Sequence, residues 1–182
     1  MKIFISGGCK NGKSYHAQRL AKAEKADKMY YIATMRSADP EDDARITRHK
    51  KERAGWGFET VEQAVDIEEI LKKCDCGGSF LLDSLTALLA NEMFLPDGSV
   101  NCNAAEKIIC GLSQVTDNIE NIVIVSDYIY SDACIYDELT EKYRRSLAKI
   151  DRAAADSCDV ALEVAYANVI AHKGGDLYEK IF

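Results

Sequence analysis

The sequence predicts an α/β fold of three layers, in which helices cover both faces of a mostly parallel central sheet. Short apolar runs alternate with helical patterns along the chain, and residues 122–125 form the most apolar of these runs. Strands that are buried on both faces have this pattern, because crossover helices cover both sides of a parallel sheet. The 182 residues are enough for one α/β domain and too few for two, so we expect a single domain over residues 1–182.

In the first half of the chain the expected strands are residues 2–6, 29–33, 56–61 and 79–83, and the expected helices are residues 13–25, 40–53 and 65–73. The strands are short apolar or extended segments. The first helix is rich in Ala, Lys, Gln and Glu, which favour helices. The second begins at Pro40, because proline suits the first helical turn, and the third is amphipathic.

In the second half the expected helices are residues 85–94, 103–118 and 137–156, and the expected strands are residues 121–126, 160–164 and 169–171. A Pro-Asp-Gly turn at 96–98 ends the first of these helices. The other two carry apolar residues at the three- and four-residue spacing of one helix face. The opposite face of the last helix carries Arg145, Lys149 and Arg152.

Composition excludes several classes of protein. The chain has 23 Lys and Arg against 30 Asp and Glu, a formal net charge of −7, whereas a general nucleic-acid-binding protein is normally basic. No apolar run approaches the roughly 20 residues of a membrane helix, and the first residues do not resemble a signal peptide. We therefore expect a cytoplasmic protein with no nucleic-acid partner and no membrane span, whose seven cysteines are reduced thiols.

The strongest motif is a glycine-rich loop between the first strand and the first helix. It matches G-x-x-x-x-G-K-S, and its residues are Gly7, Gly8, Cys9, Lys10, Asn11, Gly12, Lys13 and Ser14. Glycines let the backbone curl so that its N–H groups surround a phosphate, and the helix that follows directs its positive end at that anion. We expect Lys13 to contact the outer phosphates and Ser14 to bind Mg²⁺. The motif predicts a P-loop NTPase fold of the RecA-like kind that binds ATP or GTP.

Asp83 is the expected acidic partner of this loop. It ends the apolar run at residues 79–83, so its carboxylate should emerge at the carboxyl end of the strand, beside the loop. There it would hold Mg²⁺ directly or through water. An aspartate after a strand is usually only a turn or cap residue, but the glycine-rich loop favours the metal role.

His49 is a candidate nucleophile on the charged helix. Asp42, Arg45 and His49 share one helix face, at positions i, i+3 and i+7. A neutral imidazole can attack a nucleotide phosphorus, and neighbouring cations would stabilise the charge on the transferred group. The alternative is a solvated basic face with an incidental histidine, and these residues taken alone favour that alternative.

Several segments, in order, resemble one known family. They are the glycine-rich loop, Y-I-A-T at 31–34, R-I-T-R-H-K at 45–50 with Trp56, T-V-E at 60–62, L-D-S-L-T at 82–86 with Asn91, Y-R at 143–144 and A-A-A-D at 153–156. The chain resembles the bifunctional adenosylcobinamide kinase and adenosylcobinamide-phosphate guanylyltransferase of cobalamin biosynthesis over nearly its whole length. The combination of the loop with the R-I-x-x-H and D-S-L-T segments is specific to that family.

The resemblance implies an enzyme that phosphorylates the aminopropanol hydroxyl of adenosylcobinamide, takes GMP from GTP onto a histidine, and passes the GMP to the new phosphate. It implies that His49 is the guanylylated nucleophile and that Asp83 is an acidic metal or nucleotide contact. The residues it implies for the guanine nucleotide are Lys50, Lys51, Glu52, Arg53 and Glu62, with Ala33, Thr34 and Met35 nearby. A corrinoid substrate and a homotrimer are implied as well.

Two segments depart from the family pattern. The family's N-E-V-G-x-G is D-Y-I-Y-S-D at residues 127–132, and its F-R-D-x-x-G-x-x-N-Q is Y-R-R-S-L-A-K-I-D-R at residues 143–152. Replacing glycines adds Cβ atoms where a ligand approaches the backbone. Two alternatives therefore stay open: a diverged kinase or nucleotidyltransferase that acts on another small substrate, and a non-catalytic relative that keeps GTP. The acceptor and the choice of ATP or GTP for the kinase step are open too.

Overall fold

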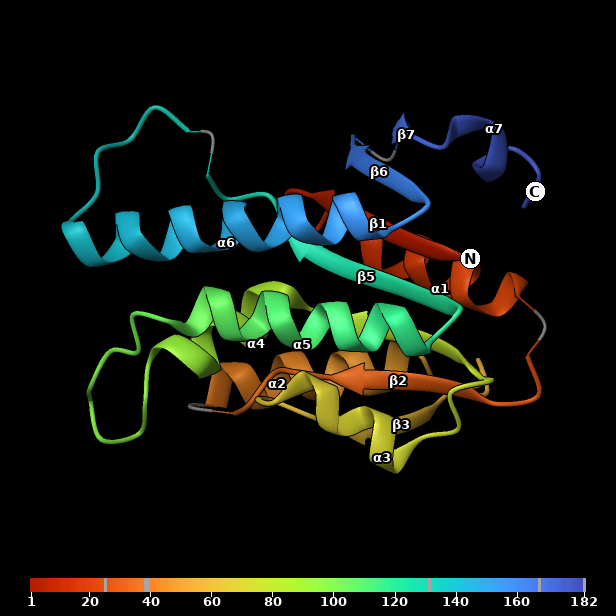
Figure 1. The fold of residues 1–182 in the computed structure, drawn as a ribbon, viewed down its shortest axis with the longest axis horizontal. Helices are drawn as coiled ribbons and strands as arrows, with labels where there is room; N and C mark the ends of the chain where they lie inside the picture. Colours follow the sequence, from red (N-terminus) through yellow and green to blue (C-terminus); the bar gives the residue numbers. More distant parts are fainter. Residues whose placement is uncertain (25, 38–39, 131, 167, 182) are drawn as a thin grey trace.

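A sheet of seven strands runs through the middle of the described molecule (Figure 1), in the order β3-β2-β4-β5-β1-β6-β7. The computed structural model describes residues 1–24, 26–37, 40–130, 132–166 and 168–181, and of residues 42, 45, 49 and 52 it describes the backbone alone. The strands are β1 (Lys2–Gly7), β2 (Met29–Ala33), β3 (Glu59–Glu62), β4 (Ser79–Asp83), β5 (Asn121–Asp127), β6 (Val160–Ala165) and β7 (Asn168–Lys173).

Helices connect these strands, close to the positions that the sequence predicts. They are α1 (Lys13–Ala23), α2 (Pro40–Glu52), α3 (Ile70–Lys73), α4 (Leu85–Met93), α5 (Ala104–Asn118), α6 (Glu138–Ser157) and α7 (Gly175–Tyr178), with a 3₁₀ turn η1 (Ile67–Glu69) before α3. Asp137 caps α6, because its side chain accepts hydrogen bonds from the backbone N–H groups of Leu139 and Thr140.

The sheet is parallel from β3 to β6, and only the pairing of β6 with β7 is antiparallel. The carboxyl ends of the parallel strands therefore lie at one edge of the sheet, where open α/β sheets bind their ligands. The glycine-rich loop leaves β1 at this edge, and the last residues of β2, β4 and β5 are Ala33, Asp83 and Asp127. The strand expected at residues 169–171 lies within β7, but its antiparallel direction and the short helix α7 are features that the sequence patterns did not predict.

Two apolar layers hold helices to the sheet and confirm the predicted three-layer fold. Phe4, Phe80 and Ile124 point to the face covered by α4, α5 and α6. Neighbouring residues such as Ile5 point to the opposite face, which packs against α1. This alternation is expected of a parallel strand that is buried on both sides.

The expected helix at residues 65–73 is broken in the structure. Asp66 has a left-handed backbone (φ 50°), and the 3₁₀ turn η1 and the single turn of α3 follow it. Its N–H donates to Glu92 Oε1 over 2.7 Å, and its carboxylate lies 2.6 Å from Lys107 Nζ, which also contacts Glu92. These contacts with α4 and α5 override the local helical pattern.

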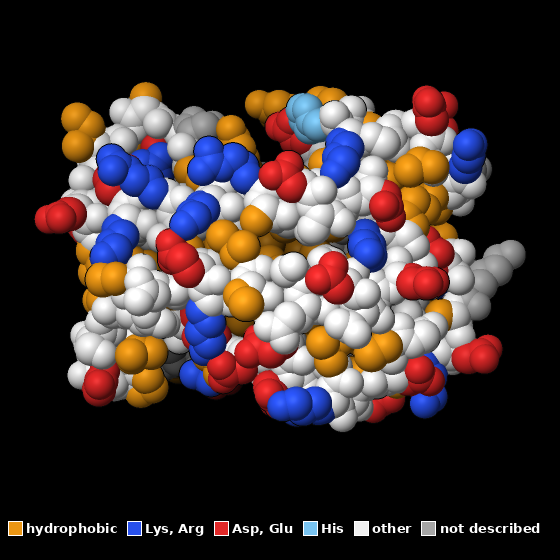
Figure 2. Space-filling model, viewed as in Figure 1, with side chains coloured by type: hydrophobic (Ala, Val, Ile, Leu, Met, Phe, Trp, Pro, Cys, Tyr) orange, Lys and Arg blue, Asp and Glu red, His pale blue; other side chains and the backbone are white. Residues whose placement is uncertain are grey.

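The surface is mixed in charge, with one basic cluster. Figure 2 shows Lys and Arg side chains gathered over α6, whereas acidic side chains are spread over much of the same face. Part of this basic charge is paired, since Lys149 Nζ lies 2.6 Å from Glu106 Oε1. Among the described helices, none offers an apolar stretch long enough to cross a membrane.

Candidate functional site

Close packing against β6 fixes the glycine-rich loop. A Cβ added to Gly7 would lie 2.4 Å from the backbone oxygen of Val164, so no larger residue fits there without moving backbone. The Asn11 amide donates to the same Val164 oxygen, and Asn11 Oδ1 accepts from the N–H of Lys13 over 3.2 Å. Gly12 precedes α1 with φ 91°, a left-handed conformation that glycine adopts readily.

Lys13 is held inside the loop. Its side chain is 8% exposed, and its Nζ donates to the Gly8 carbonyl oxygen over 3.1 Å and to Asp127 Oδ1 over 2.5 Å. Asp127 is a site residue that sequence reasoning missed. One signal was available: like Asp83, Asp127 comes at the end of a buried apolar run.

A cavity of about 590 Å³ opens beside the loop, and we name it the loop cavity. Its described lining residues include the loop residues 9–14, the carboxylates Asp83 and Asp127, and Tyr15, Arg48 and Trp56. Ser14 and Asp83 line this one cavity, as the sequence predicted for a metal pair. Mg²⁺ takes oxygen ligands, keeps several waters, and usually needs only one or two protein carboxylates besides phosphate oxygens. The donors present therefore fit Mg²⁺, although no group of three or more His, Cys, Asp or Glu among the described residues could hold a metal ion alone.

Asp83 is oriented by β2. The Tyr31 hydroxyl donates to Asp83 Oδ2 over 2.8 Å, and burial, together with the charge of Asp83, raises the pKa of Tyr31 far above its usual value. The Arg53 guanidinium lies 4.1 Å from the centre of the Tyr31 ring. Thr34 joins the ends of β2 and β4, because its hydroxyl accepts from the Ser84 N–H over 2.7 Å.

A second cavity of about 700 Å³ lies next to the first, and we name it the α2 cavity. It brings together most of the residues implied for the guanine nucleotide, namely Ala33, Met35, Lys50, Arg53 and Glu62. Two of the implied residues do not line this cavity: Thr34 is fully buried, and Lys51 is exposed on the surface. The two cavities share Met35, Asp83 and Ser84, so they adjoin at Asp83.

Helix α2 contributes residues to both cavities. Asp43, Ile46 and Lys50 line the α2 cavity, and Arg48 lines the loop cavity. His49 belongs to this helix. The side chains of His49 and Glu52, and those of Asp42 and Arg45 on the expected helix face, lie outside the described residues.

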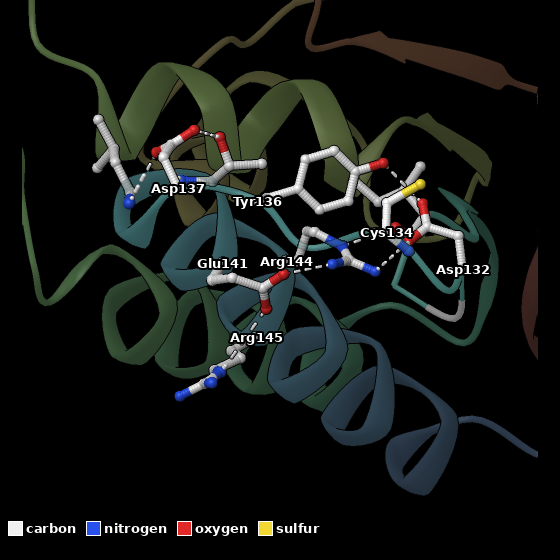
Figure 3. Close-up of polar contacts among 10 residues, drawn as sticks. Asp132, Cys134, Tyr136, Asp137, Glu141, Arg144 and Arg145 are labelled. Atoms are coloured by element: carbon white, nitrogen blue, oxygen red, sulfur yellow. Dashed lines mark hydrogen bonds and ion pairs between the residues drawn. The ribbon is translucent and has the colours of Figure 1, made fainter.

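The two segments that depart from the family pattern contact each other (Figure 3). Arg144 Nη2 lies 2.9 Å from Asp132 Oδ1, and Arg144 Nε donates to the Ile129 carbonyl oxygen. The Tyr136 ring packs against the same guanidinium, and the centre of the ring lies 4.6 Å from the guanidinium carbon of Arg144. Tyr130 donates to Asp151 over 3.1 Å. The segment after β5 is therefore fastened to α6 by residues of both departing segments.

Comparison with known proteins places the chain in a family. Residues 3–169 match the CobU family, described as cobinamide kinase / cobinamide phosphate guanyltransferase. The chain is 29% identical to the bifunctional adenosylcobalamin biosynthesis protein CobP of Pseudomonas aeruginosa over 161 residues, which cover 87% of this chain and 90% of that protein.

Two further relatives match over shorter stretches. The bifunctional adenosylcobalamin biosynthesis protein CobU of Escherichia coli is 32% identical over 95 residues, 52% of this chain and 51% of that protein. The CobU of Salmonella typhimurium is 35% identical over 101 residues, 54% of this chain and 53% of that protein. With a phosphate loop, an acidic strand end and a family match over nearly its whole length, the chain belongs to the CobU family of cobinamide kinases and cobinamide phosphate guanyltransferases.

Proposed function

We propose that this protein phosphorylates adenosylcobinamide and then transfers GMP from GTP to the new phosphate, through a GMP adduct of His49. The observation that carries the proposal is the meeting of two cavities at Asp83. One has a phosphate-binding loop, and the other has basic and acidic residues of α2 and β3. In this proposal a single nucleotide extends from one cavity into the other.

The loop cavity would hold the triphosphate. Lys13 would exchange its contact with Asp127 for the outer phosphates, and the loop N–H groups and the start of α1 would surround them. Ser14 and Asp83 would hold Mg²⁺, which neutralises phosphate charge when it is bound. The base would occupy the α2 cavity, where a carboxylate such as Glu62 can accept hydrogen bonds from the N–H groups of guanine.

In the guanylyl step an imidazole nitrogen of His49 would form a bond to the α-phosphorus of GTP. The bond from that phosphorus to the bridging oxygen of the β-phosphate breaks, and pyrophosphate leaves with the electron pair. A phosphate oxygen of the phosphorylated corrinoid then displaces the imidazole. Arg48 and Lys50, next to His49 on α2, line the cavities where negative charge develops.

The test is incubation with GTP labelled at the α-phosphate, followed by adenosylcobinamide phosphate. We expect a protein-bound label with the mass of one GMP, which is labile in mild acid and stable in base, as a phosphoramidate is. His49→Ala should form no adduct and keep the kinase step. His172→Ala is the matched control, because His172 pairs with Glu163 on the surface and should form the adduct normally. A folded, GTP-binding parent protein that forms no adduct would contradict the guanylyltransferase proposal.

One observation supports a second candidate, a kinase or nucleotidyltransferase of the same fold that acts on another acceptor. The departing segments 127–132 and 143–152 contact each other, and the first of them begins with Asp127, which lines the loop cavity. Transfer of labelled γ-phosphate separates the candidates. Labelling of adenosylcobinamide supports the first, and labelling only of other hydroxyl compounds supports the second.

A further inference from the structure

Asp127 is a carboxylate that neither the metal nor the nucleotide roles above employ. Its backbone is fixed on both sides, because its N–H donates to Thr86 Oγ1 over 2.9 Å and the next N–H, of Tyr128, donates to the Gly7 carbonyl oxygen over 3.0 Å. Its side chain lines the loop cavity and is 27% exposed. The position is therefore rigid, and the carboxylate is accessible from the cavity.

The two oxygens of Asp127 have different surroundings. Oδ1 contacts Lys13 Nζ, whereas Oδ2 accepts no hydrogen bond from the described part of the chain. In P-loop enzymes the loop lysine contacts the outer phosphates. A carboxylate that touches this lysine lies beside the phosphorus that is transferred, where an attacking hydroxyl has to approach.

The described lining of the loop cavity offers one other carboxylate, Asp83. Asp83 already accepts a hydrogen bond from Tyr31 and is the candidate Mg²⁺ ligand. The family pattern N-E-V-G-x-G has its acidic residue one position later, where this chain has Tyr128. This chain therefore carries its acidic group one position earlier, and in that position it contacts Lys13.

We propose that Asp127 is a catalytic residue, the general base of the kinase step, and this inference rests on the function proposed above. The acceptor hydroxyl oxygen forms a bond to the γ-phosphorus, and the bond from that phosphorus to the oxygen bridging to the β-phosphate breaks. The nucleoside diphosphate leaves with the electron pair. The hydroxyl proton passes to Asp127 Oδ2 and later to water. A carboxylate within hydrogen-bond reach of the attacking group is what such a proton transfer needs.

The alternative is that Asp127 serves only as the counter-charge of Lys13. Asp127→Asn separates the two roles, because asparagine keeps the shape and a hydrogen-bond acceptor for Lys13 but cannot take up the proton. Asp117→Asn, an exposed aspartate of α5, is the matched control. Three quantities are measured: γ-phosphate transfer to adenosylcobinamide, slow release of γ-phosphate to water without acceptor, and the dissociation constant of the nucleotide.

We expect Asp127→Asn to lower transfer and release by about 100-fold or more, the usual contribution of a general base. The nucleotide dissociation constant and the GMP adduct should stay within about threefold of the parent values. In Asp127→Ala, added formate should restore part of the rate, because it supplies a carboxylate to the vacated space. Rates within threefold of the parent, or rates that fall only in proportion to nucleotide binding, would overturn the proposal.

The two readouts distinguish this inference from the proposed function. A parent protein that releases γ-phosphate but does not phosphorylate adenosylcobinamide contradicts the proposed acceptor. Loss of that release in Asp127→Asn would then still support the base. A parent protein that performs neither reaction overturns both.

Discussion

Asp151 places a carboxyl group in the core where α6 packs beside β5. It is 3% exposed, and its Oδ2 accepts a hydrogen bond from Tyr130. Its Oδ1 and the facing Ser126 hydroxyl are buried without a hydrogen bond of normal geometry among the described residues. Burial raises the pKa of Asp151 to about 7; the Ser126 and Tyr130 hydroxyls oppose the rise, and the charge of Asp127 adds to it.

This raised pKa predicts a pH-dependent stability. Between about pH 4 and pH 7 the folded protein keeps the Asp151 proton, whereas the unfolded chain loses it, so the free energy of unfolding falls as the pH rises and levels off above pH 7. A shift of about three units corresponds to at most about 4 kcal/mol. Asp151→Asn should remove this fall and be more stable than the parent at pH 8, as urea unfolding at pH 5 and pH 8 would measure. The exposed Asp156→Asn should keep it, and equal pH dependence in parent and Asp151→Asn would contradict the assignment.

The Tyr31 hydroxyl orients Asp83, so its removal should affect the metal before the fold. In Tyr31→Phe we expect the Mg²⁺ concentration for half-maximal turnover to rise about three- to tenfold. This is less than the about 1.5–3 kcal/mol of a hydrogen bond to a charged group would give, because the Tyr31 hydroxyl contacts Asp83 with and without the metal. Tyr30→Phe is the control, since Tyr30 accepts from the Asp75 N–H on the other face of β2. An unchanged Mg²⁺ dependence would show that Asp83 needs no such support.

At the scale of elements, the strands and long helices could be predicted because each one buries a continuous apolar run or stripe. The break at residues 65–73 could not, because it depends on Asp66, Glu92 and Lys107, which meet only in the folded chain. The strand expected at residues 169–171 lies within the mostly exposed edge strand β7, but its antiparallel direction could not be predicted, because it depends on the pairing with β6. Local patterns thus give the elements, and distant polar contacts modify their ends.

Arg144 joins two elements, and its loss should loosen the segment between β5 and α6. It is buried, and its guanidinium contacts Asp132, Glu141 and the Tyr136 ring (Figure 3). Arg144→Met should lower the free energy of unfolding by about 1–3 kcal/mol, less than for a fully buried ion pair because both acidic partners are partly exposed. Arg145→Met is the matched control: Arg145 is 83% exposed, and its change should stay within about 0.5 kcal/mol. Chemical denaturation measures both, and equal losses would contradict the fastening role of Arg144.

At the scale of the molecule, the site depends on an order of strands that the sequence does not contain. The loop and Asp83 were predicted from their own residues. However, β5 lies between β1 and β4, so Asp127 of the intervening strand, rather than Asp83, contacts Lys13. Local patterns identify strand ends but not which strands are neighbours, and for this reason the pairing of Lys13 with Asp127 was missed.

The described chain has one phosphate loop for the two proposed reactions, each of which would consume a triphosphate, and its two cavities adjoin at Asp83. We therefore expect one nucleotide to occupy the loop at a time. An ATP analogue with a β,γ-imido bridge should inhibit formation of the GMP adduct competitively with GTP. Lys13→Ala should weaken both γ-phosphate transfer and adduct formation, because one charged contact to a desolvated phosphate contributes about 2–5 kcal/mol.

The matched control for Lys13 is Lys28→Ala, since Lys28 is an exposed lysine paired with Asp75 and should leave both reactions unchanged. Initial rates of label incorporation at several GTP concentrations, with and without the analogue, measure the competition. Saturating analogue that leaves adduct formation unaffected would contradict the shared loop, and it would require a second triphosphate site. Glu62→Gln tests the other end of the same nucleotide: it should weaken adduct formation from GTP while sparing phosphoryl transfer from ATP, because a carboxylate can accept from the adjacent N1–H and N2–H donors of guanine, whereas adenine has an acceptor at N1.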